Sequence, residues 1–206
     1  MTVAPLVIAC GALASELRAV LRAHGLEDAV EVTYLPANLH NRPERIVPEL
    51  EPMLDSAAAH DRPVFIGYAD CGTGGALDAL LARHPEATRL PGSHCYEFFS
   101  GSDVFAALHE EELGSFFLTD FLAKHFDALM WQGLGLDRHP ELLDMYFGNY
   151  KRVVLISQTD DESIVDKGRA AAQRLGLDFE HRHVGLAPFT EAVTNAVSIS
   201  MSKRVA

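Results

Sequence analysis

Three cysteines, Cys10, Cys71 and Cys95, each follow a predicted buried strand and lie beside glycines. The strands read "PLVIA", "PVFIGY" and "ATRL", and glycine lets the backbone after them approach a bound group closely. If the strands are parallel, their carboxyl ends meet at one edge of a sheet, where α/β proteins bind ligands. Thiolates are ligands of zinc and of iron–sulfur clusters. We therefore expect the three thiols to converge and to hold a metal.

Two metal groups suit three thiolates. A 4Fe-4S cluster on three cysteines leaves one iron open to substrate, and lone cysteines on separate strand ends favour it, because zinc sites more often contain a close pair. Zinc is the alternative, with His94 as a fourth ligand. The chain has no CxxC pair, so the cysteines could instead be ordinary buried residues. Cys71 could also be a metal-free nucleophile with His94 as its base.

Charged and polar side chains near the cysteines could bind a small anionic substrate and move a proton. Asp70 and Glu97 are the candidate catalytic residues, although Asp70 could instead cap the turn that follows it. The segment "LHNRPERI" follows a predicted strand, and its arginines could hold a carboxylate or phosphate. A solvated helix start is the alternative for that segment. The substrate-binding residues expected there are His40, Asn41, Arg42 and Arg45.

Two later segments contain further polar candidates. The stretch "GLDRHPELLDMYFGNYKR" is dense in polar and aromatic residues without clean periodicity, which is typical either of a loop lining a pocket or of a surface helix with an irregular start. Tyr146 and Asn149 are its candidate substrate-binding residues. In "EHRHV", His181 and His183 share one face of a predicted strand. They could chelate zinc, but the pattern favours an exposed strand face.

The hydrophobic pattern predicts strands alternating with helices over most of the chain. Strands are expected at 5–9, 30–35, 63–68, 87–90, 152–157 and 177–184, and helices at 12–24, 43–59, 74–83, 162–176 and 188–197. Residues 91–103 are expected to form a loop, 104–126 to be mostly helical, and 198–206 to be a frayed tail. Such alternation is typical of a mostly parallel sheet with helices on both faces. We expect a single Rossmann-like α/β domain over residues 1–206.

Composition excludes several functional classes. The 206 residues have a formal net charge of −12, which argues against a nucleic-acid partner because phosphate binding needs a basic face. No apolar stretch approaches the roughly 20 residues of a membrane helix, and the N-terminus lacks the basic and apolar regions of a signal peptide. An odd number of cysteines does not indicate a disulfide framework. We expect a cytoplasmic protein.

Several long segments resemble a known family. The blocks "VIACGALASEL", "LPANLHNRPERI", "YADCGTGGALDALL", "PGSHCYEFFSGS" and "GLGLDRHPELLDMYFGNYKRVV" together resemble the bacterial branch of the uncharacterised family catalogued as domain of unknown function 1638. The resemblance runs over nearly the whole chain, and the family's cysteine positions all match. It implies no particular reaction. Members tend to be encoded near corrinoid proteins and corrinoid-dependent methyltransferases, which implies a link to one-carbon metabolism.

Taken together, the residues and the resemblance predict a metal-dependent enzyme or accessory redox protein acting on a small anionic substrate. Zinc activation of a thiol for methyl transfer is the second expectation. A non-enzymatic corrinoid-binding or docking module is the third. A corrinoid protein or methyltransferase is the partner implied by the resemblance, and the last helix with the aromatic middle segment could supply a homodimer surface.

Overall fold

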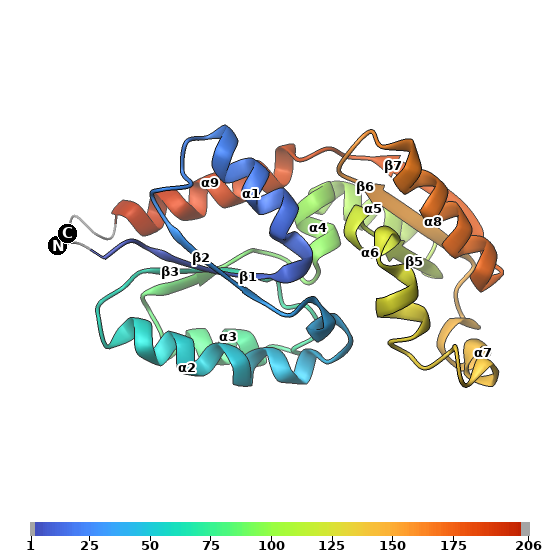
Figure 1. The fold of residues 1–206 in the computed structure, drawn as a ribbon, viewed down its shortest axis with the longest axis horizontal. Helices are drawn as coiled ribbons and strands as arrows, with labels where there is room; N and C mark the ends of the chain where they lie inside the picture. Colours follow the sequence, from blue (N-terminus) through green and yellow to red (C-terminus); the bar gives the residue numbers. More distant parts are fainter. Residues whose placement is uncertain (1–2, 203–206) are drawn as a thin grey trace. The chain divides into compact units, whose positions relative to one another are not determined.

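A computed structural model describes residues 3–202 of the chain (Figure 1). Packing of the backbone divides the chain into two compact units, residues 1–98 with 188–206 and residues 99–187. Each unit contains its own parallel sheet. The fold is therefore α/β, as the alternation of strands and helices predicts.

The first unit contains a four-stranded parallel sheet in the order β2-β1-β3-β4. The central strands β1 and β3 are the most apolar, because helices cover both of their faces. The register places Cys10, the last residue of β1, opposite Leu35, the last residue of β2. The strands are β1 Leu6–Cys10, β2 Glu31–Leu35, β3 Val64–Gly67 and β4 Ala87–Arg89.

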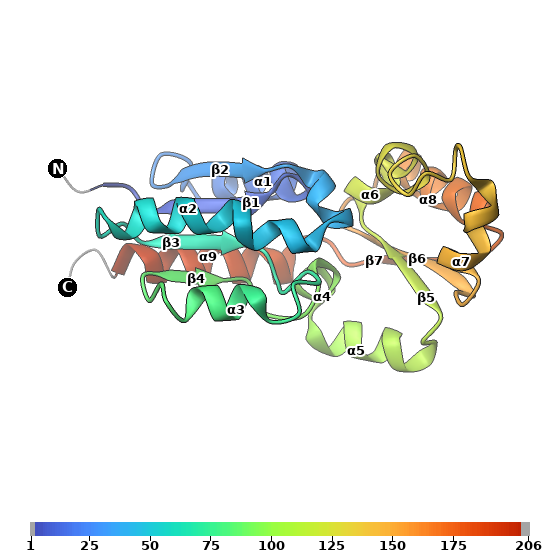
Figure 2. The ribbon, with the colours of Figure 1, turned by 90° about the horizontal axis from the view of Figure 1, so that it is seen from below.

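Helices cover both faces of this sheet. Two short 3-10 turns follow β2, and α2 comes after them with Pro52 inside it. The helical segments are η1 Gly11–Leu13, α1 Ala14–Ala23, η2 Ala37–Asn41, η3 Pro43–Arg45, α2 Ile46–Ala58, α3 Ala76–Leu81, α4 Cys95–Ser100 and α9 Ala187–Ser202. Figures 1 and 2 show α2 and α3 on one face of the sheet and α1 and α9 on the other.

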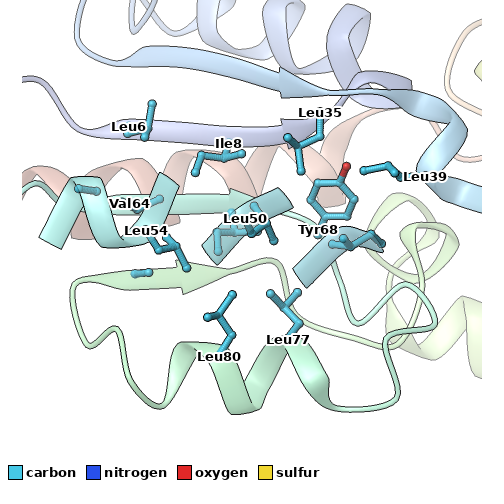
Figure 3. Close-up of a cluster of buried hydrophobic side chains, with 14 residues drawn as sticks. Leu6, Ile8, Leu35, Leu39, Leu50, Leu54, Val64, Tyr68, Leu77 and Leu80 are labelled. Atoms are coloured by element: carbon cyan, nitrogen blue, oxygen red, sulfur yellow. The ribbon is translucent and has the colours of Figure 1, made fainter. Parts of the chain in front are cut away.

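A cluster of buried hydrophobic side chains fills the space between the sheet and the helices α2 and α3 (Figure 3). Leu50 and Leu54 stand four residues apart on α2 and are both 0% exposed. Apolar residues at this spacing form one stripe along a helix, and burying that stripe docks α2 on the sheet. Cys10 and Cys71 pack against the same cluster, so the core holds two of the three cysteines in place.

The second unit contains a three-stranded parallel sheet in the order β5-β6-β7. Its strands are β5 Ser115–Leu118, β6 Arg152–Ser157 and β7 Asp178–His183. The helix α8 Glu162–Leu175 packs closely on this sheet, because a Cβ at Gly168 would lie 3.1 Å from the side chains of Leu155 and Phe179. The remaining segments are α5 Ser102–Glu111, α6 Asp120–Lys124, the π-helical turn Asp127–Trp131, η5 Pro140–Leu142 and α7 Leu143–Phe147.

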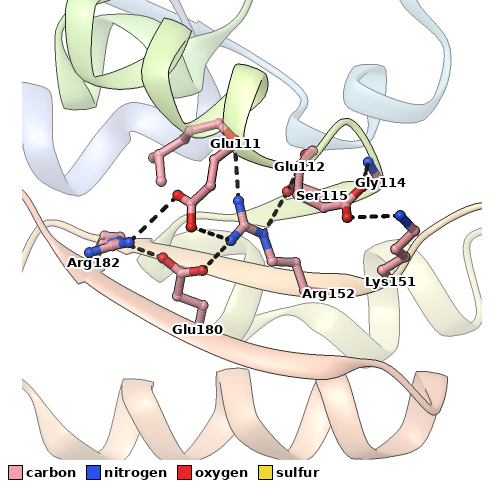
Figure 4. A network of polar contacts seen from close by, with 9 residues as sticks. Glu111, Glu112, Gly114, Ser115, Lys151, Arg152, Glu180 and Arg182 are labelled. Carbon is pink, nitrogen blue, oxygen red and sulfur yellow. Dashed lines mark hydrogen bonds and ion pairs between the residues drawn. The ribbon is translucent and has the colours of Figure 1, made fainter.

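Arg152 joins the elements on the other face of this second sheet (Figure 4). Its guanidinium donates to Glu180 Oε2 at 2.6 Å, Glu111 Oε1 at 3.3 Å, Ser115 Oγ at 2.8 Å and the Leu108 carbonyl oxygen at 3.2 Å. These partners lie on β7, α5 and β5. The fork of a guanidinium can serve several acceptors at once, so this charged group stabilises the unit.

Four predictions need correction. The described residues form two sheets where one was expected, and "SFFL" is the strand β5 within the segment predicted to be helical. Pairing with β6, begun by the Lys151 N–H donating to the Gly114 carbonyl, overrides the local helical preference. Cys95 begins the helix α4 where a loop was expected. The helix α9 runs to Ser202, so of the predicted frayed tail only 203–206 lies outside the described residues.

Candidate functional site

The three cysteines lie at the carboxyl edge of the first sheet. Cys10 ends β1, Cys71 follows the end of β3 at Gly67, and Cys95 begins α4, the helix after β4. All three strands run parallel, so their carboxyl ends share one edge. All three thiols are free and partly buried. The arrangement agrees with the position predicted from the sequence.

Backbone hydrogen bonds join the loops that carry Cys71 and Cys95. The Asp70 N–H donates to the Gly92 carbonyl at 3.2 Å, and the Cys71 N–H donates to the Ser93 carbonyl at 2.9 Å. The loop after β4 therefore runs directly beside the loop after β3. Cys71 stands inside this pairing, and Cys95 follows it by two residues in the chain.

Cys71 adopts a left-handed backbone conformation with φ of 50°. This conformation costs an L-residue about 1–2 kcal/mol, and such strain persists only where the surrounding structure holds it. The glycines that follow, Gly72, Gly74 and Gly75, also have positive φ values, of 83°, 63° and 87°. The glycines thus let the chain turn tightly, while the cysteine occupies a position that glycine would fill more easily.

The three thiols influence one another electrostatically. Burial raises the pKa of Cys71 to about 12, with a further contribution from the charge of Cys10. Burial raises the pKa of Cys95 well above its usual value, and the charges of Cys71 and Cys10 add to the effect. The pKa of Cys10 is raised mainly by burial. Each thiol therefore lies close enough to another for a thiolate on one to disfavour a thiolate on the next.

Backbone N–H groups act in the opposite direction. The Ala12 N–H bonds the Cys10 thiol, and the N–H of Cys95 bonds the thiol of Cys71; each contact lowers the pKa of the thiol. The Tyr96 N–H does the same for Cys95. N–H groups directed at sulfur stabilise a thiolate. A bound cation would offset the remaining cost of burying that negative charge.

Tyr68 lies beside two of these thiols, those of Cys10 and Cys71. It follows Ile66 on the same face of the chain, is 2% exposed, and belongs to the hydrophobic cluster (Figure 3). Its hydroxyl has no hydrogen-bond partner of normal geometry among residues 3–202, and Cys10 is its polar neighbour. Burial, and then the charge of Cys10, raises the pKa of Tyr68. The neutral hydroxyl is thus a donor placed next to a sulfur atom.

Asp70 and Glu97, the predicted proton-transfer residues, both accept hydrogen bonds from the loops that carry the cysteines. Asp70 accepts from the Thr73 hydroxyl at 2.7 Å and from the N–H groups of Gly75 and Gly74 at 2.9 and 3.1 Å. These bonds, the Thr73 contact first, lower the pKa of Asp70. Glu97 Oε2 accepts from the Ser93 N–H at 2.8 Å. The turn-capping alternative for Asp70 is therefore present in the structure.

The arginine-bearing segment after β2 lies near the same edge. A Cβ on Gly11 would lie 2.9 Å from the Leu35 carbonyl oxygen, so glycine after Cys10 lets the start of this segment pass close to the backbone there. Burial, and then the charge of His94, lowers the pKa of His40, so these two predicted residues are neighbours. Asn41 ends η2.

The two predicted arginines differ in their contacts. The Arg45 guanidinium forms an ion pair with Glu49 Oε1 at 2.9 Å, so part of it already has an anionic partner. Arg42 is exposed between η2 and η3. Arg42 is therefore the better candidate of the two for an anionic group.

Tyr146 and Asn149 belong to the second unit, whereas the three cysteines belong to the first. Both are exposed, Tyr146 on α7 and Asn149 after it. A neighbouring pocket of about 530 Å³ is lined by the segments 140–150 and 175–177, including Phe147 and Tyr150. Neither Tyr146 nor Asn149 is among its lining residues.

The donor set of the thiol site, which we define as Cys10, Cys71, Cys95 and Tyr68, fits a thiolate-bound group in kind. Three free thiols, backbone N–H groups directed at sulfur and a buried hydroxyl without a normal partner are the features such a group would use. The thiols do not enclose one point, because within residues 3–202 no group of three or more His, Cys, Asp or Glu side chains is arranged to hold a metal ion.

Fold and site together define a parallel α/β protein with a cysteine-based candidate site at a sheet edge. A family model described as "Protein of unknown function (DUF1638)" matches residues 34–193, and the chain belongs to this family. The match includes Cys71 and Cys95. No curated protein and no solved structure matches the chain. In the described part of the chain, no helix is both long and apolar enough to cross a membrane.

Proposed function

We propose that the protein binds a metal centre through the thiolates of Cys10, Cys71 and Cys95 and acts as a metal-dependent enzyme or accessory redox protein. The observation that supports this most is that three partly buried free thiols share the carboxyl edge of one sheet and interact electrostatically. Ordinary core cysteines need not gather in this way, because each would pack equally well elsewhere in the core.

The raised pKa values of the thiols support a bound cation as the group that would stabilise the thiolates. Without one, the thiols stay protonated, since their burial and mutual repulsion both disfavour the thiolates. A metal displaces these protons and supplies the compensating charge. The Tyr68 hydroxyl would then gain a strong acceptor in the Cys10 thiolate, which removes the cost of leaving a buried hydroxyl without a partner.

A 4Fe-4S cluster is the group we favour, with zinc as the alternative. The three cysteines stand on separate segments, at the end of β1 and after β3 and β4, and none forms the close pair that zinc sites more often use. When bound, such a cluster would present one iron without a protein ligand, able to act as a Lewis acid. In the zinc alternative, His94 would be the fourth ligand.

The residues around the thiols suit a small anionic substrate. Arg42 would hold its anionic end, with His40 and Asn41 on the same segment. Asp70 and Glu97 hold the cysteine loops in place and are our candidates for moving a proton, because each stands beside a cysteine-bearing loop.

Metal content is the measurement that tests this proposal. The full-length protein is purified under strict anaerobiosis, and iron, acid-labile sulfide and zinc are measured per chain together with the visible spectrum. We expect about four iron atoms per chain with a broad brown absorbance. One zinc without colour would favour the alternative metal. No metal before or after anaerobic reconstitution with iron and sulfide would refute the proposal.

Single variants connect the metal to the site. Cys10→Ser, Cys71→Ser and Cys95→Ser should each lose most of the metal while the far-ultraviolet circular dichroism stays unchanged. Met145→Leu is the control, because it changes an exposed sulfur-containing side chain of the second unit. Equal metal content in all four variants would contradict the assignment.

The partner class is tested separately. The family resemblance implies a corrinoid protein or a methyltransferase, and cobalamin is the probe for a corrinoid-binding module. A shift in the cobalamin spectrum on mixing, in protein that contains no metal, would favour the non-enzymatic docking function.

A further inference from the structure

A second polar cluster lies at the carboxyl edge of the other sheet, entirely within the second unit. Ser157 ends β6 and His183 ends β7, and the register pairs these two residues directly. Ser157 Oγ lies 2.8 Å from His181 Nε2 and 3.2 Å from His183 Nδ1. Two imidazoles from one strand therefore point a ring nitrogen at the same hydroxyl.

The two histidines share the face of β7 that packs against α8. Phe179, His181 and His183 alternate along the strand, and side chains two residues apart lie on one face. Phe179 meets α8 at Gly168, which identifies this face. The histidines follow it toward the carboxyl end of β7, and both are exposed to solvent.

The carboxylate of Asp160 lies beside Nε2 of His183, the ring nitrogen that does not face Ser157. His183 Nε2 lies 3.3 Å from Asp160 Oδ1, in the loop between β6 and α8. A proton on Nε2 bonded to Asp160 leaves Nδ1 as a lone-pair donor toward Ser157. Histidines that bind metals commonly donate their other ring N–H to a carboxylate in this way.

The backbone around Ser157 is held firmly. Ser157 is 0% exposed. Its carbonyl oxygen accepts hydrogen bonds from the N–H groups of Val184 at 2.9 Å and Gly185 at 3.3 Å. These bonds connect the end of β6 to the residues directly after His183. The two ring nitrogens therefore converge at a sheet edge that these backbone hydrogen bonds hold in place.

We propose that His181, His183 and Ser157 form a binding site for a borderline divalent transition-metal ion, of the zinc or nickel class, that is separate from the thiol site. Imidazole nitrogen is the ligand type that such ions prefer. Both ring nitrogens lie within hydrogen-bond distance of the same Ser157 Oγ, at 2.8 and 3.2 Å, so the two imidazoles converge on one point. The histidines are the ligands, Ser157 supports them, and water completes the coordination.

The contacts do not favour reading Ser157, His183 and Asp160 as a nucleophile with its base. Ser157 is fully buried, so a substrate has no access to its oxygen. The backbone N–H groups of the next two residues, which could otherwise stabilise an oxyanion, donate to the carboxylate of Asp120 at 3.1 and 2.9 Å. A metal ion reaches the exposed histidines without these requirements.

The test uses the full-length protein with Ni²⁺ as the probe, followed by NMR. Bound Ni²⁺ broadens nearby amide signals, so the thiol site and the histidine pair report on different residues. We expect broadening at the amides of residues 181–184 and 157–160 at one equivalent of metal per histidine pair. Broadening confined to residues around Cys10, Cys71 and Cys95, or spread over all exposed histidines, would overturn the proposal.

Variants sharpen the result. His181→Asn and His183→Asn should each abolish the broadening at β7, and Asp160→Asn should weaken Ni²⁺ binding by about tenfold. His139→Asn is the matched control, an exposed histidine of the same unit that also faces a carboxylate, Glu141 at 3.1 Å. Asp160 is exposed, so its variant remains informative if a histidine variant fails to fold. Unchanged Ni²⁺ affinity in Asp160→Asn together with unchanged broadening in either histidine variant would contradict the site.

Discussion

At the residue scale, Cys71 combines a strained backbone with a thiol that is difficult to ionise. Its φ of 50° lies in the left-handed region that glycine adopts without strain. Burial, and then the charge of Cys10, raises the pKa of its thiol to about 12. The strained backbone lowers the free energy of unfolding, and the thiol that resists ionisation lowers it at alkaline pH. Both can be measured in the metal-free protein, where no ligand masks them.

Replacement of Cys71 separates the backbone strain from the loss of the thiol. Cys71→Ala and Cys71→Gly both remove the sulfur, but only glycine relieves the left-handed backbone. We expect the glycine variant to unfold with a free energy about 1 kcal/mol higher than that of the alanine variant, measured by urea denaturation. An alanine variant equal to or more stable than the glycine variant would show that this position is not strained.

The thiols also predict a dependence of stability on pH. The pKa of Cys71 rises from an ordinary value of 9.0 to about 12 on folding, mainly because the thiol is buried. Its contribution to stability is therefore complete below about pH 9 and is lost as the pH rises toward 12, because the unfolded chain ionises first. Urea unfolding of the metal-free protein at about pH 8 and about pH 10.5 should show this loss. Cys71→Ala, the reference, should lose less over the same range.

At the element scale, short loops rather than the strands decide where the thiols lie. The loop after β3 is closed by Asp70, which accepts from Thr73, Gly74 and Gly75, and it is joined to the loop after β4 by backbone bonds. The sheet supplies a common edge, and these hydrogen bonds determine how near Cys71 comes to Cys95.

Removing the Asp70 carboxylate tests this loop closure. Asp70→Ala should lower the free energy of unfolding by about 1–2 kcal/mol and reduce metal content, because three hydrogen bonds are lost. Asp70→Asn keeps one acceptor oxygen and should retain more of both. The pKa of Asp70 is lowered mainly by the Thr73 hydroxyl, so its contribution disappears as the pH falls below about 4. Identical stability of Asp70→Ala and the parent protein would exclude the role.

At the scale of the whole molecule, the chain returns to its first unit after completing the second. Residues 188–206 belong with residues 1–98, and α9 covers the face of the first sheet opposite α2 and α3 (Figure 1). Phe189, Val193 and Val197 of α9 are 1%, 0% and 1% exposed. Phe189 stacks on Phe98 with ring centroids 5.4 Å apart, and Phe98 belongs to α4, the helix that begins at Cys95.

Phe189→Ala should therefore weaken both the core and the thiol site. We expect the free energy of unfolding to fall by about 3–5 kcal/mol, because a buried aromatic side chain is removed. Metal content should fall as α4 loses its support. Ile199→Ala on the same helix is the control, since Ile199 is 50% exposed and should change neither quantity. Full metal content in a stable Phe189→Ala protein would separate α9 from the site.

Local signals predicted the elements whose pattern is strong. The apolar runs of β1, β3 and β6 are clear because strands buried on both faces exclude polar residues. The strand β5 was missed because four residues, Ser115–Leu118, give too little periodicity against helical neighbours. The helix α4 was missed because the glycines flanking Cys95 and Tyr96 indicate a loop.

The sequence by itself determined the α/β class, the family resemblance and the shared strand-end position of Cys10, Cys71 and Cys95, because alternation and burial are local properties of the chain. Only the tertiary structure decided that the strands form two sheets, that Tyr68 stands beside Cys10, and that Ser157 lies between His181 and His183. These contacts join residues far apart in the sequence. Strand pairing and core packing select them, and neither is encoded in any single segment.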